Sequence, residues 1–435
     1  MTRPTVVILD DDPTGTQAVA DIPVITSPTP ENLRWAFDTS PLGFFVLTNT
    51  RSLDEPAMVA LTKTIVTEVI RAAGSRPVRF VSRSDSTLRG HIFAEPAAIR
   101  SALREVGAPA PAMTVFVPAF PRAGRITRDG VHLLRDADGE APAHESHFAQ
   151  DATFGYTTSF LPELVAERSS GDLTSDDIVV VTPDRVASGV REARGSWLAC
   201  DAEDDADLAT IAAALSEADP NADRTLIRAS PGILPALLGL PVSTELPRHG
   251  AAPHAGGLII VGSHVAQTTR QLARLLEEPD VTLLELDVDD LVDANAAAVD
   301  AIIERLASHA AAGLASSHVV IATGRVARTF SDPDRSLAFA RRVSDTLVAV
   351  TRRTMERFPV AFVVAKGGIT SSDIATRAMR IERAIVRGRV GAGIVWQPAD
   401  DTTRIPLALV PGNIGDDEGL VEAVRGVSYQ RSSAE

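Results

Sequence analysis

Apolar runs typical of strands alternate with amphipathic stretches typical of helices along the first half of the chain. The runs are rich in Val, Ile and Phe, and apolar residues recur at helical spacing between them, as in residues 55–73 and 92–106. The strand-like runs are Thr5–Leu9, Val24–Thr26, Gly43–Thr48, Val78–Ser82, Met113–Val117 and Val179–Thr182. Strands that alternate with helices of this length build βαβ units, so this half predicts an α/β fold with a largely parallel sheet.

A segment without periodicity interrupts this alternation. Leu240–Gly257 is rich in Pro, Gly and Ala, which is typical of a linker. Further strand-like runs follow at Gly257–Val261, Val281–Leu286, Val319–Thr323, Val360–Ala365, Ile394–Trp396 and Leu407–Val410. The 435 residues suit two domains. We expect two domains, 1–240 and 257–435, joined by a linker over 241–256. Each should be a largely parallel sheet flanked by helices, with the active site in the cleft between them.

One strand end of the second half is suited to binding a phosphate. The apolar run Val360–Ala365 leads into Gly367 and Gly368, and the polar residues 370–373 then begin a helical pattern. Glycines let a ligand approach the backbone closely, and the N–H groups at a helix start favour an anion. An ordinary strand-to-helix turn is the alternative. Two further glycine turns, Gly262-Ser263 and Gly412-Asn413, favour a nucleotide site in this half.

Charged residues follow the strand-like runs of the first half. Asp10, Asp11 and Asp12 directly follow the first run, and adjacent carboxylates repel one another unless a cation or a substrate hydroxyl is present. Three later strand ends carry arginines, in residues 49–52 and 83–91 and in the stretch 118–130. Arginine suits bidentate recognition of a carboxylate, although any one of them could instead form a surface ion pair. Because ligands bind at the carboxyl ends of strands, this pattern predicts a site for a small acid.

Composition narrows the classes of partner. The net charge of −15 argues against nucleic acid and anionic membranes. The single cysteine, Cys200, excludes an internal disulfide and a cysteine-based metal site, and His144 and His147 are followed by no third ligand at metal spacing. We therefore expect no protein metal site. The N-terminal residues do not resemble a signal peptide and no apolar run approaches about 18 residues, so we expect a cytoplasmic protein.

These segments together resemble the four-carbon acid sugar kinases, nearly from end to end. Motifs of that family's N-terminal half look like Asp11–Gly15, Thr50–Ser52, Asp85–Gly90 and Pro118–Arg125 here. Motifs of its C-terminal half look like Gly262-Ser263 and Gly367–Ser371. The resemblance implies an ATP-dependent kinase that phosphorylates a hydroxyl of a small sugar acid. The substrate would be a four-carbon aldonic acid, a 3-oxo acid or a related branched acid, bound by the N-terminal domain, with ATP and Mg²⁺ at the C-terminal domain.

The resemblance also implies roles for particular residues. The expected ATP-binding residues are Ser263, Gly367, Gly368, Ile369, Thr370 and Gly412. The expected acid-binding residues are Asp11, Arg51, Ser84, Asp85, Ser86, Thr87 and Arg89. Asp11 or Asp12 would accept the proton of the substrate hydroxyl, with Asp85 as the competing candidate. An arginine of Arg122–Arg125 would stabilise the transferring phosphoryl group.

Two departures and two rival functions remain open at this point. Val410-Pro411 stands where much of the family has Lys-Ser, so a lysine contact to phosphate there is missing, and Pro411 has no N–H to donate. The start reads Asp10-Asp11-Asp12-Pro13, where many members have Ala-Asp-Asp and then Leu or Phe. The rivals are a two-domain sugar-acid-binding protein without chemistry and a metal-dependent aldolase or dehydratase. Neither the P-loop nor the G-x-G-x-x-G signature is present. A homo-oligomer is compatible with the sequence.

Overall fold

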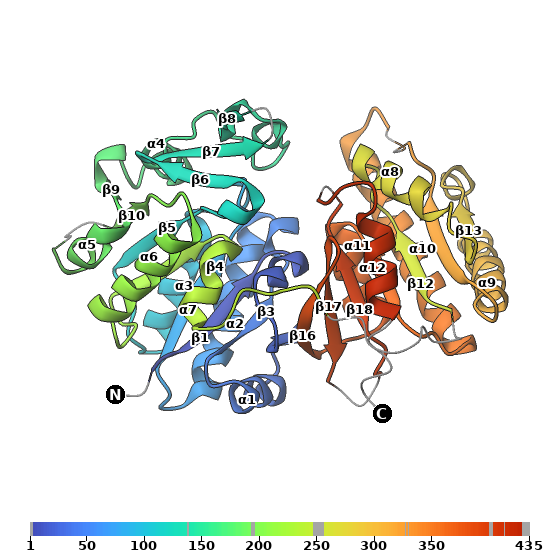
Figure 1. Ribbon diagram of the computed structural model, residues 1–435, viewed down its shortest axis with the longest axis horizontal. Coiled ribbons are helices and arrows are strands. Elements are labelled where there is room, and N and C mark those ends of the chain that lie inside the picture. Colours follow the sequence, from blue (N-terminus) through green and yellow to red (C-terminus); the bar gives the residue numbers. More distant parts are fainter. Residues whose placement is uncertain are drawn as a thin grey trace. The chain divides into compact units, whose positions relative to one another are not determined.

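The computed structural model describes residues 3–136, 139–192, 196–246, 256–326, 328, 330–399, 403–412 and 414–428 (Figure 1). The chain divides into two units, Met1–Val242 and Ser243–Glu435. In each unit helices cover a largely parallel sheet, so the predicted α/β class is confirmed.

The N-terminal unit is built on a sheet of parallel strands in the order β2-β3-β1-β4-β11-β5-β10-β9. The strands are β1 (Thr5–Asp10), β2 (Ile22–Ile25), β3 (Gly43–Leu47), β4 (Val78–Arg83), β5 (Met113–Val117), β9 (Ile178–Val181), β10 (Trp197–Cys200) and β11 (Thr225–Ala229). The helices are α1 (Pro30–Thr39), α2 (Glu55–Ala73), α3 (Ala94–Glu105), α4 (Leu161–Arg168), α5 (Val186–Glu192), α6 (Asp205–Ala218) and α7 (Leu234–Leu238). All six residues of β1 are buried, as its apolar run predicts for a central parallel strand.

A small antiparallel sheet in the N-terminal unit was not expected from the pattern. It consists of β6 (Arg125–Arg128), β7 (Val131–Asp136) and β8 (Gly139–Pro142), and its first strand lies inside the arginine-bearing stretch 118–130. Asp129 and Gly130, both with positive φ, make the two-residue turn between β6 and β7. Asp-Gly is the preferred sequence for such a hairpin turn.

The C-terminal unit has a sheet in the order β13-β14-β12-β15-β18-β17-β16. The strands are β12 (Leu258–Val261), β13 (Val281–Leu286), β14 (His318–Thr323), β15 (Val363–Lys366), β16 (Arg383–Val390), β17 (Gly393–Pro398) and β18 (Leu407–Val410). The helices are α8 (Ala266–Leu275), α9 (Ala296–Gly313), α10 (Pro333–Arg357), α11 (Gly368–Asp373) and α12 (Gly419–Ser428). The pairings from β13 to β18 are parallel, whereas β16 and β17 are antiparallel additions.

The strand order places a topological switch point between β12 and β15. The chain moves from β12 to β13 and β14 on one side and then to β15 on the other. In open α/β sheets, ligands bind at the carboxyl ends of the strands at such a point. The glycine turns after β12 and β15 are therefore brought together by the topology.

The predicted linker is described only in part, because its residues 247–255 lie outside the described residues. Leu246 donates a backbone hydrogen bond to Arg389 in β16 at 2.8 Å, so this end of the segment pairs with the C-terminal sheet. Within the described ranges, no helix is long and apolar enough to span a membrane.

A buried ion pair fixes α3 onto the N-terminal sheet. Glu95 on α3 and Arg228 on β11 have side chains only 1% exposed, and Arg228 Nη1 lies 2.6 Å from Glu95 Oε2. Ser82 on β4 also donates to Glu95, and Thr50 donates to it at 3.0 Å. Removing one partner of such a pair leaves an uncompensated buried charge.

We expect Glu95→Ala to lower the free energy of unfolding by about 3–5 kcal/mol, because Arg228 would keep its charge in a buried site. Glu105→Ala, at the other end of α3, removes a more exposed ion pair with Lys63 and should change stability little. Urea denaturation followed by circular dichroism measures both variants. Similar losses in the two would contradict the importance of the buried pair.

Candidate active site

The carboxyl ends of β1, β3 and β4 bring the predicted acid-binding residues of the N-terminal unit to one edge of the sheet. The parallel register sets Asp10 of β1 beside Leu47 of β3 and Arg83 of β4. Arg83 is 3% exposed and forms an ion pair with the fully buried Asp10. Burial raises the pKa of Asp10 to about 7, although Arg83 acts in the opposite direction.

Asp11 is a buried carboxylate that has an ion-pair partner but receives no hydrogen bond. It is 2% exposed, and Oδ1 lies 3.0 Å from Nη1 of Arg83. Among the described residues, neither of its carboxylate oxygens accepts a hydrogen bond. Gly90 lies alongside, with φ of 108°, and a Cβ there would be 3.3 Å from Asp11 Oδ2. A hydroxyl donor reaching Asp11 would find both oxygens available as acceptors.

Both carboxylate oxygens of Asp12 have partners nearby. Its side chain caps the short helical turn Pro13–Ala18 by accepting from Thr14 N at 2.9 Å and from Thr14 Oγ1 at 2.7 Å. Its other oxygen forms an ion pair with Arg51. Burial alone would raise the pKa of Asp12, but Arg51, Arg83 and the Thr14 hydrogen bonds outweigh it and hold the pKa below its ordinary value.

Asp85 is likewise surrounded by donors. It accepts from Arg89 Nε at 2.6 Å and from the hydroxyl of Thr87, and Arg51 Nη1 lies 3.5 Å away. Burial acts to raise the pKa of Asp85, but Arg51 and Arg89 together with the hydrogen bonds lower it to about 2. Arg51 and Arg89 therefore both lie beside Asp85, and each already faces an aspartate.

The loop that carries Asp85 is held by groups from elsewhere in the unit. Tyr156 donates its hydroxyl to Thr87 O at 2.9 Å, and the ring of His132 is hydrogen-bonded to Ser86 O at 2.8 Å. Ser84 is buried, and its hydroxyl has no hydrogen-bond partner in the part of the chain that the structure describes. The backbone of this loop is thus fixed independently of the arginines.

Arg122 and Arg125 differ in their surroundings. Arg122 is half exposed and forms an ion pair with Asp205 at 2.7 Å. Arg125, at the start of β6, is partly buried, and its Nε has no hydrogen-bond partner among the described residues. Burial lowers the pKa of Arg125, and the charge of Asp85 partly offsets this effect. Arg125 is thus a cation near Asp85 with no ion-pair partner in the described ranges.

Sequence reasoning did not single out Arg83 and Arg228 as site residues. Both are charged residues in strands whose side chains are largely buried, β4 and β11, and that placement is the signal which could have found them. Arg83 neutralises Asp10 and Asp11, and Arg228 pairs with Glu95. A hypothetical Cβ on Gly90 would lie 3.4 Å from Arg228 Nη2, so this guanidinium also borders the space beside Asp11.

The turns after β12, β15 and β18 meet at the switch point of the C-terminal unit. Gly367 N donates to Val410 O at 2.8 Å, and Thr268 Oγ1 donates to Gly412 O at 2.9 Å. A Cβ on Gly412 would lie 2.9 Å from Ser263 Oγ, and one on Gly262 would lie 2.4 Å from Thr370 Oγ1. The predicted nucleotide residues around these turns are therefore gathered in one place.

The backbone conformation at Gly367 favours glycine, and the neighbouring Gly368 begins a helix. Gly367 has φ of 111°, a conformation that favours glycine, and a Cβ there would be 3.0 Å from Ser263 Cβ. Gly368 begins α11, and Ile369 is 68% exposed, so its side chain adds no packing. Asn413, which completes the last turn, lies outside the described residues.

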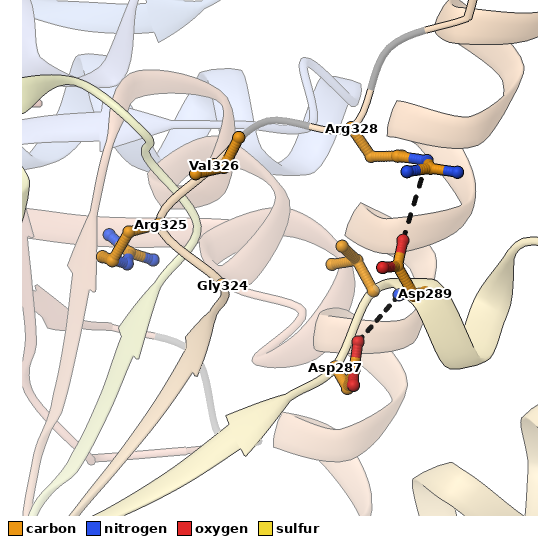
Figure 2. A pocket seen from close by; sticks show the side chains of 7 residues that line it. Asp287, Asp289, Gly324, Arg325, Val326 and Arg328 are labelled. Atoms are coloured by element: carbon orange, nitrogen blue, oxygen red, sulfur yellow. Dashed lines mark hydrogen bonds and ion pairs between the residues drawn. The ribbon is translucent and has the colours of Figure 1, made fainter.

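A separate pocket opens at the carboxyl ends of β13 and β14 (Figure 2). It encloses about 410 Å³ and is lined by Asp287, Val288, Asp289, Gly324, Arg325, Val326 and Arg328. Arg328 faces Asp289 at 3.6 Å, and Arg325 Nη1 donates to Ser263 O at 2.9 Å. None of the predicted nucleotide residues lines the pocket, so it adds no support for the phosphate-binding turns. In the described ranges, no group of three or more His, Cys, Asp and Glu side chains is arranged to hold a metal ion.

Two domain models match the chain in sequence. A sugar-binding N-terminal domain matches residues 6–237, and a nucleotide-binding C-terminal domain matches residues 258–420. The two models define a two-domain protein with a sugar-binding and a nucleotide-binding half. The model of the sugar-binding domain alone covers more than half of the chain. The chain therefore belongs to the four-carbon acid sugar kinase family.

Two named relatives agree with this assignment. The chain is 27% identical to the D-threonate kinase of Bordetella bronchiseptica over 89% of this chain and 86% of that protein. It is also 27% identical to the D-erythronate kinase of Heliobacterium modesticaldum over 67% and 66% of the two chains.

Two solved structures share the fold. One is described as a putative tRNA synthase from Salmonella typhimurium LT2, with a TM-score of 0.72 and 16% identity over 98% of this chain and 99% of that one. The other is a Haemophilus influenzae protein of the family DUF1537, with a TM-score of 0.63 and 18% identity over 96% and 98%. At these identities the likeness concerns the fold alone.

Proposed function

We propose that this protein is an ATP-dependent kinase that transfers a phosphoryl group to a hydroxyl of a small sugar acid. The acid would be a four-carbon aldonic acid, a 3-oxo acid or a related branched acid. The observation that carries the proposal is Asp11, a buried carboxylate at a strand end with no hydrogen bond to either oxygen among the described residues. It occurs in a chain whose named relatives are sugar-acid kinases.

Asp11 is the proposed general base. A base must have an acceptor oxygen within reach of the hydroxyl that loses its proton. Asp12 uses one oxygen as a helix cap and the other for Arg51, and Asp85 is surrounded by Arg89, Thr87 and Arg51. Asp11 alone of the three has no hydrogen-bond donor on either oxygen, so it is the best placed to accept a substrate proton.

The acid is proposed to bind beside Asp11 through arginines and hydroxyls. Arg51 and Arg89 face Asp12 and Asp85, so their charge is already balanced. Arg125 lacks such a partner in the described ranges, and we assign it the substrate carboxylate. The hydroxyls of Ser84, Ser86 and Thr87 would orient the hydroxyl groups of the acid.

ATP is proposed to bind at the switch point of the C-terminal unit. Gly367 to Thr370, Ser263 and Gly412 would hold its phosphates through backbone N–H groups and hydroxyls. Mg²⁺ would arrive with the nucleotide, bound chiefly by phosphate oxygens and water, and would screen the triphosphate charge. An active site in a cleft between the domains, cytoplasmic localisation and homo-oligomer formation stay predictions.

The proposal is tested by incubating the full chain with Mg-ATP and a panel of four-carbon sugar acids and their 3-oxo derivatives, with ADP release as the readout. A kinase releases ADP only when its acid is present. A binding protein without chemistry would bind an acid and release no ADP. An aldolase or dehydratase would consume its acid without nucleotide. Either of these results would refute the proposed kinase activity.

Asp11→Asn should fold normally and lower kcat by about 10²–10⁴-fold, because an amide cannot accept the substrate proton. Asp12→Asn is the matched control at the neighbouring position and should retain far more activity. Steady-state ADP release with the acid found above measures both. If Asp11→Asn keeps a near-normal kcat, the base is another residue, and Asp85 becomes the next candidate.

Arg125→Gln should raise the Kd for the acid by roughly 10- to 150-fold, because a charge-assisted contact typically contributes about 1.5–3 kcal/mol. Its melting temperature should change little, since no ion pair of Arg125 is present in the described ranges. Arg122→Gln, three positions earlier and paired with Asp205, is the control and should leave acid binding unchanged. Isothermal titration with the acid compares the two. Equal affinities would remove Arg125 from the binding site.

A further inference from the structure

Lys366 is a buried amine at the proposed nucleotide site. It ends β15 and directly precedes Gly367 and Gly368, and its side chain is fully buried. The parallel register sets it between Val261 of β12 and Val410 of β18. Paired residues of neighbouring strands point to the same face of a sheet, so the lysine stem lies between two valines.

The ammonium group of Lys366 has little to balance its charge. Nζ donates to Pro411 O at 2.5 Å, in the turn that follows β18. An ammonium carries three donors, and no carboxylate of the described residues forms an ion pair with it. Burial lowers the pKa of Lys366 from 10.5 to about 7, and no charged group opposes that shift.

Most charged groups on neighbouring elements have partners of their own, and the cation of Arg325 donates to Ser263 O at 2.9 Å. β12 and β18 contribute no titratable side chain. The groups on α8, α11, α12 and the turns after β12 and β18 are His264, Arg270, Arg274, Asp373, Asp416, Asp417, Glu418, Glu422 and Arg425. Arg270 pairs with Asp417, Arg274 pairs with Glu418, and Arg425 pairs with Glu278. Asp373 accepts from Ser344. Burial lowers the pKa of His264, which favours its neutral form.

The sequence makes this amine unusual. Of the 42 basic residues, only Lys63 and Lys366 are lysines, and the rest are arginines. Arginine keeps its proton at any physiological pH, whereas a lysine can be buried in its neutral form. Unlike arginine, lysine can therefore occupy this buried position as a neutral amine and become charged when an anion binds.

We propose that Lys366 is a positioning residue of the nucleotide site, which takes up a proton when the phosphates of a nucleotide bind at the adjoining glycine turns. The inference rests on the proposed function. The negative phosphates supply the counter-charge that the free protein lacks, and the charged amine strengthens the hydrogen bond that fixes the Pro411–Gly412 turn. Much of the resembled family has a lysine at the position of Val410. Val410 is the register partner of Lys366, so here an amine comes from the neighbouring strand β15 instead.

The sign of the pH dependence follows from this scheme. In the free protein the amine loses its proton as the pH rises through about 7. Bound phosphate raises its pKa, so above pH 7 binding must be accompanied by proton uptake. The affinity for nucleotide should therefore fall as the pH rises from 7 towards the pKa of the bound state.

The two lysines allow a direct measurement. Protein labelled selectively with ¹³C-lysine should give two Cε signals, which Lys63→Arg assigns without touching the site. Without nucleotide, the Lys366 signal should titrate near pH 7. With a saturating Mg complex of a non-hydrolysable ATP analogue, it should stay in its protonated position to higher pH, while the Lys63 signal is unchanged by the nucleotide.

Calorimetry supplies the second readout. At pH 8, binding of the same analogue in Tris and in HEPES should show uptake of most of one proton by the natural chain. Lys366→Met should take up none and bind roughly tenfold or more weakly, as expected for a lost charge-assisted contact.

The possible failures are distinguishable. Binding of the analogue with no change in the Lys366 signal, or with the same proton uptake in Lys366→Met, overturns this inference alone. No binding of the analogue by the natural chain overturns the proposed kinase function as well. The labelled natural chain decides the matter even if Lys366→Met fails to fold.

Discussion

Burial of the central parallel strands on both faces restricts where this chain can place polar chemistry. Strands such as β1 and β12 have no face open to solvent, so charged groups can be presented only where the strands end. Parallel register then brings those ends to one edge of the sheet. In the N-terminal unit this edge gathers Asp10, Asp11 and Arg83, and in the C-terminal unit it gathers Ser263, Gly367 and Gly412.

The two units handle buried charge in opposite ways. In the N-terminal unit, Arg83 faces Asp10 and Asp11, and Arg228 faces Glu95, so the charges of these two buried guanidinium groups are balanced before any ligand arrives. These ion pairs are formed in advance, so the aspartates and arginines would not need to move to accept the proposed acid. The buried Lys366 in the C-terminal unit donates to the carbonyl of Pro411, and in our proposal its charge is balanced only once a ligand brings negative charge.

Much of the fold could be read from the sequence, because long periodic segments carry a strong signal. The helix pattern at residues 55–73 corresponds to α2, and the central apolar runs correspond to strands. The pattern missed the antiparallel strands β6, β7, β8 and β16, whereas the predicted run Ile394–Trp396 lies in the antiparallel strand β17. Asp129-Gly130 is a hairpin signal at the end of the arginine-bearing stretch 118–130. In β16, buried Ala384, Val386 and Val390 alternate with exposed Arg387 and Arg389, which is a one-sided strand rather than an apolar run.

The site was predictable as a set of segments but not as a set of contacts. The motifs placed Asp85, Arg89 and Thr87 in one loop, and the structure has them hydrogen-bonded to one another. Which aspartate is left without donors depends on how β1, β3 and β4 align, and residue spacing carries no such information. The scarcity of lysine has a practical consequence. In the folded chain, amine-acylating reagents can reach the partly exposed Lys63 but not the buried Lys366. Acylation at position 366 would therefore report opening of the C-terminal unit.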